Sequence, residues 1–268
     1  MHNRPLSILR KNKKLIHCIT NPISINQCAN AILAVGARPI MAEHPLEVKE
    51  ITATASALML NTGNITDIRM KSMSISAEEA RRLKIPFIID AVGTACSELR
   101  RTFVINIINT YSPNIIKGNY SEIYALYNEA YHSSGIDSDK NLDISQMKDI
   151  MPLLAKKYKA VILASGAVDL ITDGNKFIHI KNGTSMLSEV TGTGCMLGAI
   201  CASCLSSLPA LDAACTASVL LGIAGEIAEK NSKGSGSFSY ELMDALYNIS
   251  DQDIEEKISM EEFNVEKV

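Results

Sequence analysis

The stretch LIHCITNPISINQCANAILAVGARPIMA, residues 15–42, contains one complete strand–helix–strand pattern. Its ends, LIHCIT and ARPIMA, are short apolar runs typical of buried strands, and the segment between them begins at Ser24, a favoured N-cap, and ends at Gly36. Further apolar runs follow at similar intervals: ALMLNTG, PFIIDAVG, NIIKGN and AVILAS. Apolar runs that alternate with helical patterns predict βαβ units. We therefore expect an α/β fold with a mostly parallel central sheet and helices on both faces.

The rest of the chain carries local signals of helices and a hairpin. SAEEARRL predicts a helix with Ser76 as its N-cap, and Asp173-Gly174 between two strand-like runs predicts a hairpin at an antiparallel edge. Three helices are expected over residues 194–208, 209–231 and 237–249, with a flexible loop at 231–237 and a charged, frayed end over the last twelve residues. No repeat or long linker divides the chain, so residues 1–268 are expected to form a single domain.

The composition is that of a globular protein, because 268 residues with 47% hydrophobic content can bury a deep core. A net charge of −3 gives no basic surface for nucleic acid. Neither a membrane span of about 20 uncharged apolar residues nor a secretory signal stands out, so we expect a cytoplasmic protein without membrane or nucleic-acid partners. The seven cysteines are interpreted as reduced thiols. Cys201 and Cys204 form a C-x-x-C, but no second pair or nearby histidine completes a zinc site.

The stretch SEVTGTGCMLGAI, residues 188–200, combines a glycine-rich turn with an apolar helix expected to begin near Gly194. Gly192 and Gly194 allow a ligand to approach the backbone closely. The first turn of the helix offers free N–H groups and the positive end of the helix dipole, which suit a phosphate and would favour a thiolate at Cys195. Taken alone, the turn fits an ordinary helix start equally well.

Several candidate site residues follow the predicted strands, at the edge where open parallel sheets bind ligands. They are Asn21, Met41, Glu43, Gly63, Asn64, Asp90, Lys117, Asn119, Glu122 and Ser165. Asp90 and Glu122, close to Lys117 and the helix start, would supply oxygen ligands for magnesium and positive charge for nucleotide phosphates. Structural alternatives exist: Asp90 and Asn119 could cap helices, Lys117 could be a solvated side chain, Glu122 could be an ordinary first-turn acid, and Met41 could be core.

Five motifs, CITNPISINQCANAILAVGARPIMA, NTGN, IIKGNYSEI, ASGAVDLI and VTGTGC, resemble the hydroxyethylthiazole kinase family in order and spacing over most of the chain. The cysteine of VTGTGC separates this family from the wider ribokinase-like group, which has aspartate there. The resemblance implies a ribokinase-like fold and a kinase that uses ATP and Mg²⁺ to phosphorylate the primary hydroxyl of 4-methyl-5-(2-hydroxyethyl)thiazole in thiamine salvage. It also implies a homotrimer with active sites at the subunit interfaces.

The resemblance also implies roles for single residues. The implied thiazole contacts are Met41, Gly192, Asn21 and Gly63, the implied ATP contacts are Lys117, Ser165, Asn119 and Gly194, the implied magnesium-binding residues are Asp90 and Glu122, and Cys195 is the implied catalytic residue. Lys117 stands where the family usually has arginine, so the charge is kept but the bidentate guanidinium is lost. Ser165 replaces the usual threonine and keeps its hydroxyl, while Ala91 and Ser235 replace common prolines.

The sequence leaves two rivals to this kinase. A ribokinase-like kinase for another small alcohol, such as a hydroxymethylpyrimidine, would share the nucleotide site but should carry aspartate at position 195 and more polar residues near Asn21 and Met41. A catalytically silent ligand-binding homologue would have lost metal or phosphate groups, whereas Asp90, Glu122 and the glycine turn are all present.

Overall fold

The computed structural model of the chain describes residues 4–133 and 142–265. Within them one nine-stranded sheet has the order β2-β1-β3-β4-β5-β6-β7-β8-β9. Strands β1 (Leu15–Ile19), β2 (Arg38–Ile40), β3 (Ala57–Asn61), β4 (Phe87–Asp90), β5 (Ile115–Asn119) and β6 (Val161–Ser165) are parallel. Strands β7 (Asp169–Thr172), β8 (Lys176–Ile180) and β9 (Met260–Asn264) add an antiparallel edge. The expected α/β fold and mostly parallel sheet are confirmed.

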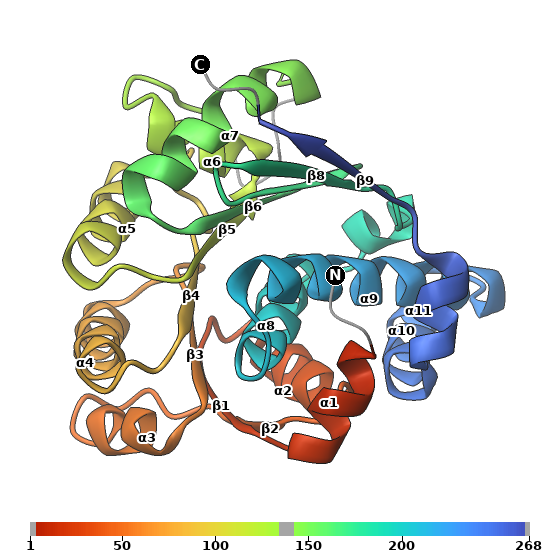
Figure 1. The fold of residues 1–268 in the computed structure, drawn as a ribbon. Helices are drawn as coiled ribbons and strands as arrows, with labels where there is room; N and C mark the ends of the chain where they lie inside the picture. The colour runs from red at the N-terminus through yellow and green to blue at the C-terminus, as the bar shows by residue number, and fades with distance from the viewer. Residues whose placement is uncertain (1–3, 134–141, 266–268) are drawn as a thin grey trace.

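Helices cover both faces of the sheet (Figure 1). One face carries α3 (Val48–Thr54), α4 (Asp67–Leu83), α5 (Glu98–Tyr111), α6 (Tyr120–Tyr127) and α7 (Ile144–Tyr158). The other carries α1 (Pro5–Asn12), α2 (Ile25–Ala34), α8 (Thr193–Leu205), α9 (Ala210–Asn231), α10 (Ser235–Asn248) and α11 (Asp251–Lys257). Strand residues alternate between the two hydrophobic cores: Met59 of β3 belongs to the α8 side and Leu60 to the α4 side. Strands buried on both faces explain the continuous apolar runs in the sequence.

The predicted hairpin is confirmed, whereas one predicted helix cap is wrong. The turn between β7 and β8 contains Gly174 with φ +91°, and the two strands pair antiparallel. The expected N-cap at Ser76 is wrong, because α4 begins at Asp67, where Oγ1 of Thr66 accepts the Arg69 N–H at 3.2 Å. Ser76 is buried inside this helix. The apolar face of the helix already packs on the sheet at positions that come earlier in the sequence than the acidic residues that suggested a first turn. Packing along that whole face lengthens the helix.

The C-terminal part of the chain also differs from the expectation. Four helices, α8 to α11, replace the expected three, and α10 already begins at Ser235 inside the expected loop. The expectation of a frayed end is wrong for residues 260–264, which form β9 and pair with β8. Backbone hydrogen bonds hold this edge strand while its charged side chains stay outside, as in the ion pair of Glu262 with Lys176 at 2.7 Å.

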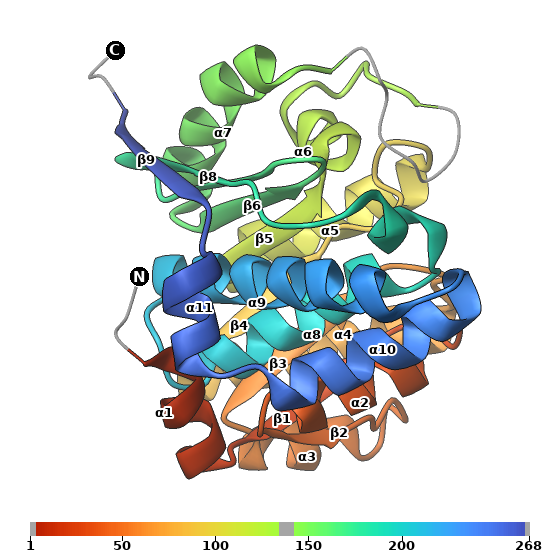
Figure 2. The ribbon, with the colours of Figure 1, turned by 90° about the vertical axis from the view of Figure 1, so that its right-hand side faces the viewer.

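Helix α9 is the most apolar long element of the described chain. By length and composition an 18-residue window of this helix could cross a membrane, whereas the sequence predicts no membrane span. However, 72% of this window is buried inside the protein. Figure 2 shows α9 running across the molecule next to α8 and α10, so its apolar residues are accounted for by packing in the core.

Segments from the two ends of the chain meet where α1 lies beside α11 (Figure 2). The backbone N–H groups of Leu6 and Ser7 donate to the carboxylate of Asp251 at 2.9 and 3.0 Å. Asp251 therefore caps α1, whose own N-cap residue, Arg4, makes no side-chain capping bond.

Candidate active site

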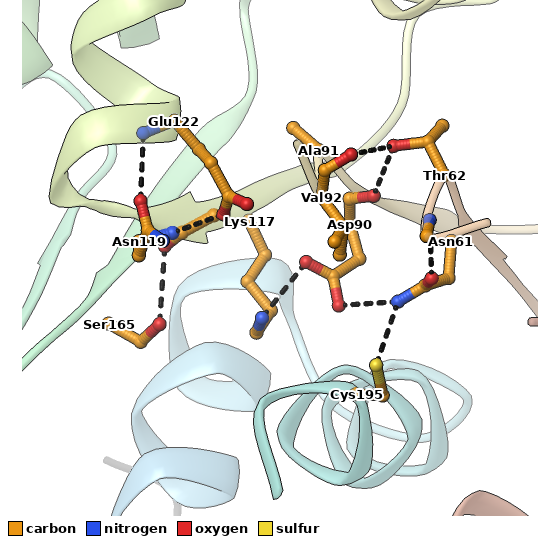
Figure 3. Close-up of polar contacts among 12 residues, drawn as sticks. Asn61, Thr62, Asp90, Ala91, Val92, Lys117, Asn119, Glu122, Ser165 and Cys195 are labelled. Atoms are coloured by element: carbon orange, nitrogen blue, oxygen red, sulfur yellow. Dashed lines mark hydrogen bonds and ion pairs between the residues drawn. The ribbon is translucent and has the colours of Figure 1, made fainter. Parts of the chain in front are cut away.

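The carboxyl ends of the central strands bring most of the predicted residues to one edge of the sheet. The strand register places Asn61 beside Asp90, Asp90 beside Lys117, and Asn119 beside Ser165. The N-terminus of α8, with Cys195, faces the same edge (Figure 3). Gly192 is the N-cap residue of α8 with φ +94°, so the helix begins at Thr193, one residue earlier than expected. A glycine is favoured at such a left-handed position.

A buried ion pair lies at the centre of the site (Figure 3). Nζ of Lys117 is 2.9 Å from Oδ1 of Asp90, and the two side chains are 4% and 0% exposed. Burial opposes the charge of Lys117, but the charge and hydrogen bond of Asp90 outweigh it and raise the pKa of the lysine. Burial raises the pKa of Asp90, although Lys117 and Asn61 oppose this shift. Lys117 is therefore a fixed positive charge, and not the solvated side chain of the structural alternative.

Cys195 is half-buried in the first turn of α8, and two amide groups approach its sulfur. Nδ2 of Asn21 and Nδ2 of Asn61 each lie 3.4 Å from Sγ. Asn61 also donates to Oδ2 of Asp90 at 2.8 Å, which connects the thiol to the ion pair. Asn61 was not among the candidate site residues, because it is the last residue of an apolar run and looks like the start of a turn.

Asn119 and Glu122 form a capping box at the start of α6. The Oε2 atom of Glu122 accepts the Asn119 N–H at 2.7 Å, and its Oε1 atom accepts the Gly93 N–H at 2.7 Å. Burial, together with the nearby charge of Asp90, raises the pKa of Glu122 to about 7 despite these two hydrogen bonds. The structure thus shows Asn119 as a helix cap, which is its structural alternative. The buried carboxyl group of Glu122, the other member of the capping box, lies close to Asp90.

The chemistry of Asp90 and Glu122 fits a magnesium ion that is held mainly by a nucleotide. No group of three or more His, Cys, Asp or Glu residues that could hold a metal occurs in residues 4–133 and 142–265. Mg²⁺ usually binds through one or two carboxylates, with phosphates and water as its other ligands, so two carboxylates suffice. The repulsion from Asp90 that helps to raise the pKa of Glu122 is an electrostatic cost that a dication would relieve.

A cavity of about 500 Å³ opens beside this centre. Ser165 and Gly194, two of the predicted nucleotide contacts, line it together with Asp169. Its far wall comes from the loop at Asn182 and from Gly222 of α9, which the sequence interpretation missed. A Cβ atom placed on Gly194 would lie 4.0 Å from Nζ of Lys117, so the charged centre borders the cavity.

The predicted substrate contacts are only partly brought together. Asn21 and Gly63 lie side by side, since a Cβ atom on Gly63 would come within 2.8 Å of Nδ2 of Asn21. Gly192 packs near α2, where a Cβ atom would lie 3.2 Å from Cβ of Ser24. Met41 follows β2, is half-buried and packs against the core on the α8 side of the sheet. This position also agrees with the structural alternative, in which Met41 is a core residue.

The fold is the ribokinase-like α/β fold. A ribokinase-like superfamily protein from Enterococcus faecalis V583 matches the fold with a TM-score of 0.65, 13% identity and 88% of each chain covered. The model of the hydroxyethylthiazole kinase family matches residues 6–252. The chain therefore belongs to the hydroxyethylthiazole kinase family, as its motifs indicated.

Two relatives show how close this membership is. "Hydroxyethylthiazole kinase 2" from Clostridium botulinum (strain Langeland) is 48% identical over 258 residues, which cover 94% of this chain and 96% of that protein. A solved structure of the hydroxyethylthiazole kinase protein from Pyrococcus horikoshii OT3 has a TM-score of 0.90, 32% identity and 97% of both chains covered. The similarity thus extends over nearly the whole chain.

Proposed function

We propose that this protein transfers the terminal phosphoryl group of ATP to the primary hydroxyl of 4-methyl-5-(2-hydroxyethyl)thiazole in thiamine salvage. The observation that carries the proposal is the position of Cys195, at the start of α8 and connected through Asn61 to the buried pair of Asp90 and Lys117. An acceptor hydroxyl beside this sulfur would face the N–H groups of the helix start, which bind developing negative charge.

The nucleotide would occupy the 500 Å³ cavity. Ser165 and Gly194 line it, and the fixed charge of Lys117 at its border would attract the phosphates. Asn119 would act from the neighbouring strand end, since it is paired in register with Ser165. Magnesium, when bound with the nucleotide, would neutralise phosphate charge, and Asp90 and Glu122 are the residues that would hold it.

In the proposed reaction the alcohol oxygen forms a bond to the γ-phosphorus, the bond from that phosphorus to the bridging oxygen breaks, and ADP leaves. The hydroxyl proton is released as the new bond forms. Sγ of Cys195 would orient the hydroxyl, and Asn21, Gly63, Gly192 and Met41 would form the thiazole pocket. Positioning and electrostatic stabilisation provide most of the acceleration in phosphoryl transfer, so a weakly basic thiol is sufficient.

The assembly is also part of the proposal. We infer a cytoplasmic homotrimer in which a neighbouring subunit completes each thiazole pocket. Exposed apolar side chains that follow two predicted pocket residues closely in the chain, Ile23 at 61% exposure after Asn21 and Leu46 at 85% after Met41, support a protein partner.

A coupled ADP-release assay with a panel of thiazole and pyrimidine alcohols tests the proposal. The hydroxyethylthiazole should give the highest kcat/KM, and turnover should require ATP and Mg²⁺. Preference for a hydroxymethylpyrimidine would establish the rival kinase. Tight thiazole binding without ADP release under any of these conditions would instead establish a silent binding protein.

A further inference from the structure

Asn61 occupies a central and fully buried place in the candidate site. It is the last residue of β3, has 0% exposure, and lies between β1 and β4 in the sheet. Side chains alternate along a strand, so Asn61 projects to the same face as Met59, which is the face covered by α8. A polar side chain buried at this depth is costly unless its hydrogen-bonding groups are satisfied.

The hydrogen bonds of Asn61 fix the orientation of its side-chain amide. The Gly63 N–H donates to Oδ1 of Asn61 at 2.9 Å. Because a backbone N–H can only donate, the oxygen must face Gly63, and Nδ2 must point the other way. Nδ2 then donates to Oδ2 of Asp90 at 2.8 Å and lies 3.4 Å from Sγ of Cys195 (Figure 3).

Backbone hydrogen bonds fix the side-chain amide of Asn21 in the same way. Its Oδ1 atom accepts the backbone N–H groups of Ile23 and Ser24 at 3.1 and 3.2 Å. Its Nδ2 atom therefore faces Oδ1 of Asn61 at 3.2 Å and Sγ of Cys195 at 3.4 Å. Two amide groups, each locked by backbone donors, thus direct N–H bonds at one sulfur atom, which makes the sulfur an acceptor in this network.

We propose that Asn61 is a positioning residue that acts through Cys195. Its amide group holds Sγ at a fixed place relative to the pair of Asp90 and Lys117, and it stabilises negative charge on the sulfur. The same amide donates to Oδ2 of Asp90, which connects the sulfur to the buried ion pair. This assignment deepens the proposed kinase function and depends on it for its catalytic meaning, but the contact between Asn61 and Cys195 can be tested separately.

The test measures the alkylation rate of Cys195 by iodoacetamide at neutral pH, with peptide mass spectrometry to separate it from the exposed Cys96. The thiolate is the reacting species, so the rate reports on groups that stabilise charge at the sulfur. The variant is Asn61→Asp, which keeps the shape and the acceptor facing Gly63. Its second oxygen removes the N–H donor from Cys195, whether that oxygen is charged or shares a proton with Asp90.

We expect Asn61→Asp to slow alkylation of Cys195 by at least about tenfold. The matched control is Asn64→Asp, the same substitution on the exposed part of the same turn, which should leave the rate within about twofold. An alkylation rate in folded Asn61→Asp equal to that of the unchanged protein would overturn the assignment. If Asn61→Asp does not fold, Asn61→Leu decides in the same way, since it fills similar space and also lacks the donor.

Kinase kinetics separate this inference from the proposed function. Asn61→Asp should lower kcat and should also raise the KM for ATP, because Asn61 contacts both the cysteine and Asp90, which would bind magnesium with the nucleotide. A purely structural role would leave the rate of Cys195 alkylation unchanged in folded Asn61→Leu, which lacks the donor and adds no charge; slower alkylation in Asn61→Asp alone would therefore overturn the assignment, because the added carboxylate repels a thiolate by itself. If the unchanged protein has no kinase activity, the proposed function fails, and the alkylation rates still decide whether Asn61 acts on Cys195.

Discussion

Gly222 of α9 is expected to tolerate no side chain, because the wall of the cavity lies directly against it. A Cβ atom at Gly222 would lie 2.6 Å from the backbone oxygen and 2.7 Å from the carbonyl carbon of Asn182. Asn182 is held in place, since its Nδ2 donates to the Lys257 carbonyl at 2.8 Å and its Oδ1 accepts the Ser259 N–H at 2.7 Å. The clash is therefore with anchored backbone and cannot be relieved by a side-chain rotation.

The expected change in the free energy of unfolding for Gly222→Ala is the balance of opposing contributions. Forcing a methyl group into packed space costs about 1–3 kcal/mol, and each hydrogen bond weakened by a shift of Asn182 costs about 1 kcal/mol more. Replacing a helical glycine by alanine returns about 1 kcal/mol. We expect Gly222→Ala to be about 1–3 kcal/mol less stable, which lowers Tm by roughly 2–10 °C for a chain of this size. The KM for ATP should rise as well, because Asn182 and Gly222 both line the cavity.

The assay is thermal unfolding by calorimetry, combined with initial rates at varied ATP concentration. The matched control is Gly236→Ala in α10, where an added Cβ atom meets nothing within 4 Å. This control should be neutral or more stable by up to about 1 kcal/mol, with an unchanged KM for ATP. The reasoning is refuted if Gly222→Ala matches Gly236→Ala in both Tm and KM.

Three further substitutions test the charged centre and the thiazole pocket. Lys117→Arg should lower the KM for ATP by roughly twofold to tenfold without changing the KM for the alcohol, because a guanidinium binds phosphate with two hydrogen bonds; an unchanged KM for ATP would argue that Lys117 does not contact phosphate. The pKa of Glu122 is raised to about 7, so the folded state binds more protons than the unfolded state, and stability should fall by up to about 3 kcal/mol as pH rises from 4.5 to 7. Glu122→Gln should reduce that slope in denaturant titrations, and an identical slope would count against the shifted pKa. Met41→Asp should raise the KM for the alcohol more than the KM for ATP, because an apolar contact becomes a desolvated charge; equal effects on both would contradict a place for Met41 in the pocket, and light scattering would show whether the assembly loosens.

The six parallel strands were predictable because each lies in a short apolar run, and five of them are almost entirely buried, the exception being the partly exposed edge strand β2. The β9 strand was not, since Glu261 and Glu262 make it look like a solvated tail, and its pairing with β8 uses backbone groups that any sequence has. The prediction of a helix cap at Ser76 was wrong for a related reason. A cap signal depends on a few local residues, whereas the apolar face that packs α4 on the sheet extends over its whole length.

The candidate site was predictable as a set of strand-end residues but not as a network. Asp90 and Lys117 follow apolar runs, so their shared edge could be inferred from a parallel sheet. Asn61 could not be singled out, because its role depends on the register that sets it beside Asp90 and on α8 crossing the same edge. The capping box of Asn119 and Glu122 was visible in the sequence, whereas the contact of Glu122 with Gly93 joins the first turn of α6 to the loop after β4.

The capping of α1 by Asp251 has a consequence for synthesis of the chain. A ribosome delivers Leu6 long before Asp251, so the N–H groups at the start of α1 wait for a partner 245 residues away. Contacts between such distant residues form late, because closing a long loop costs entropy first. Nascent chains arrested before residue 251 should therefore lose α1 to a protease readily, and release of the complete chain should protect it.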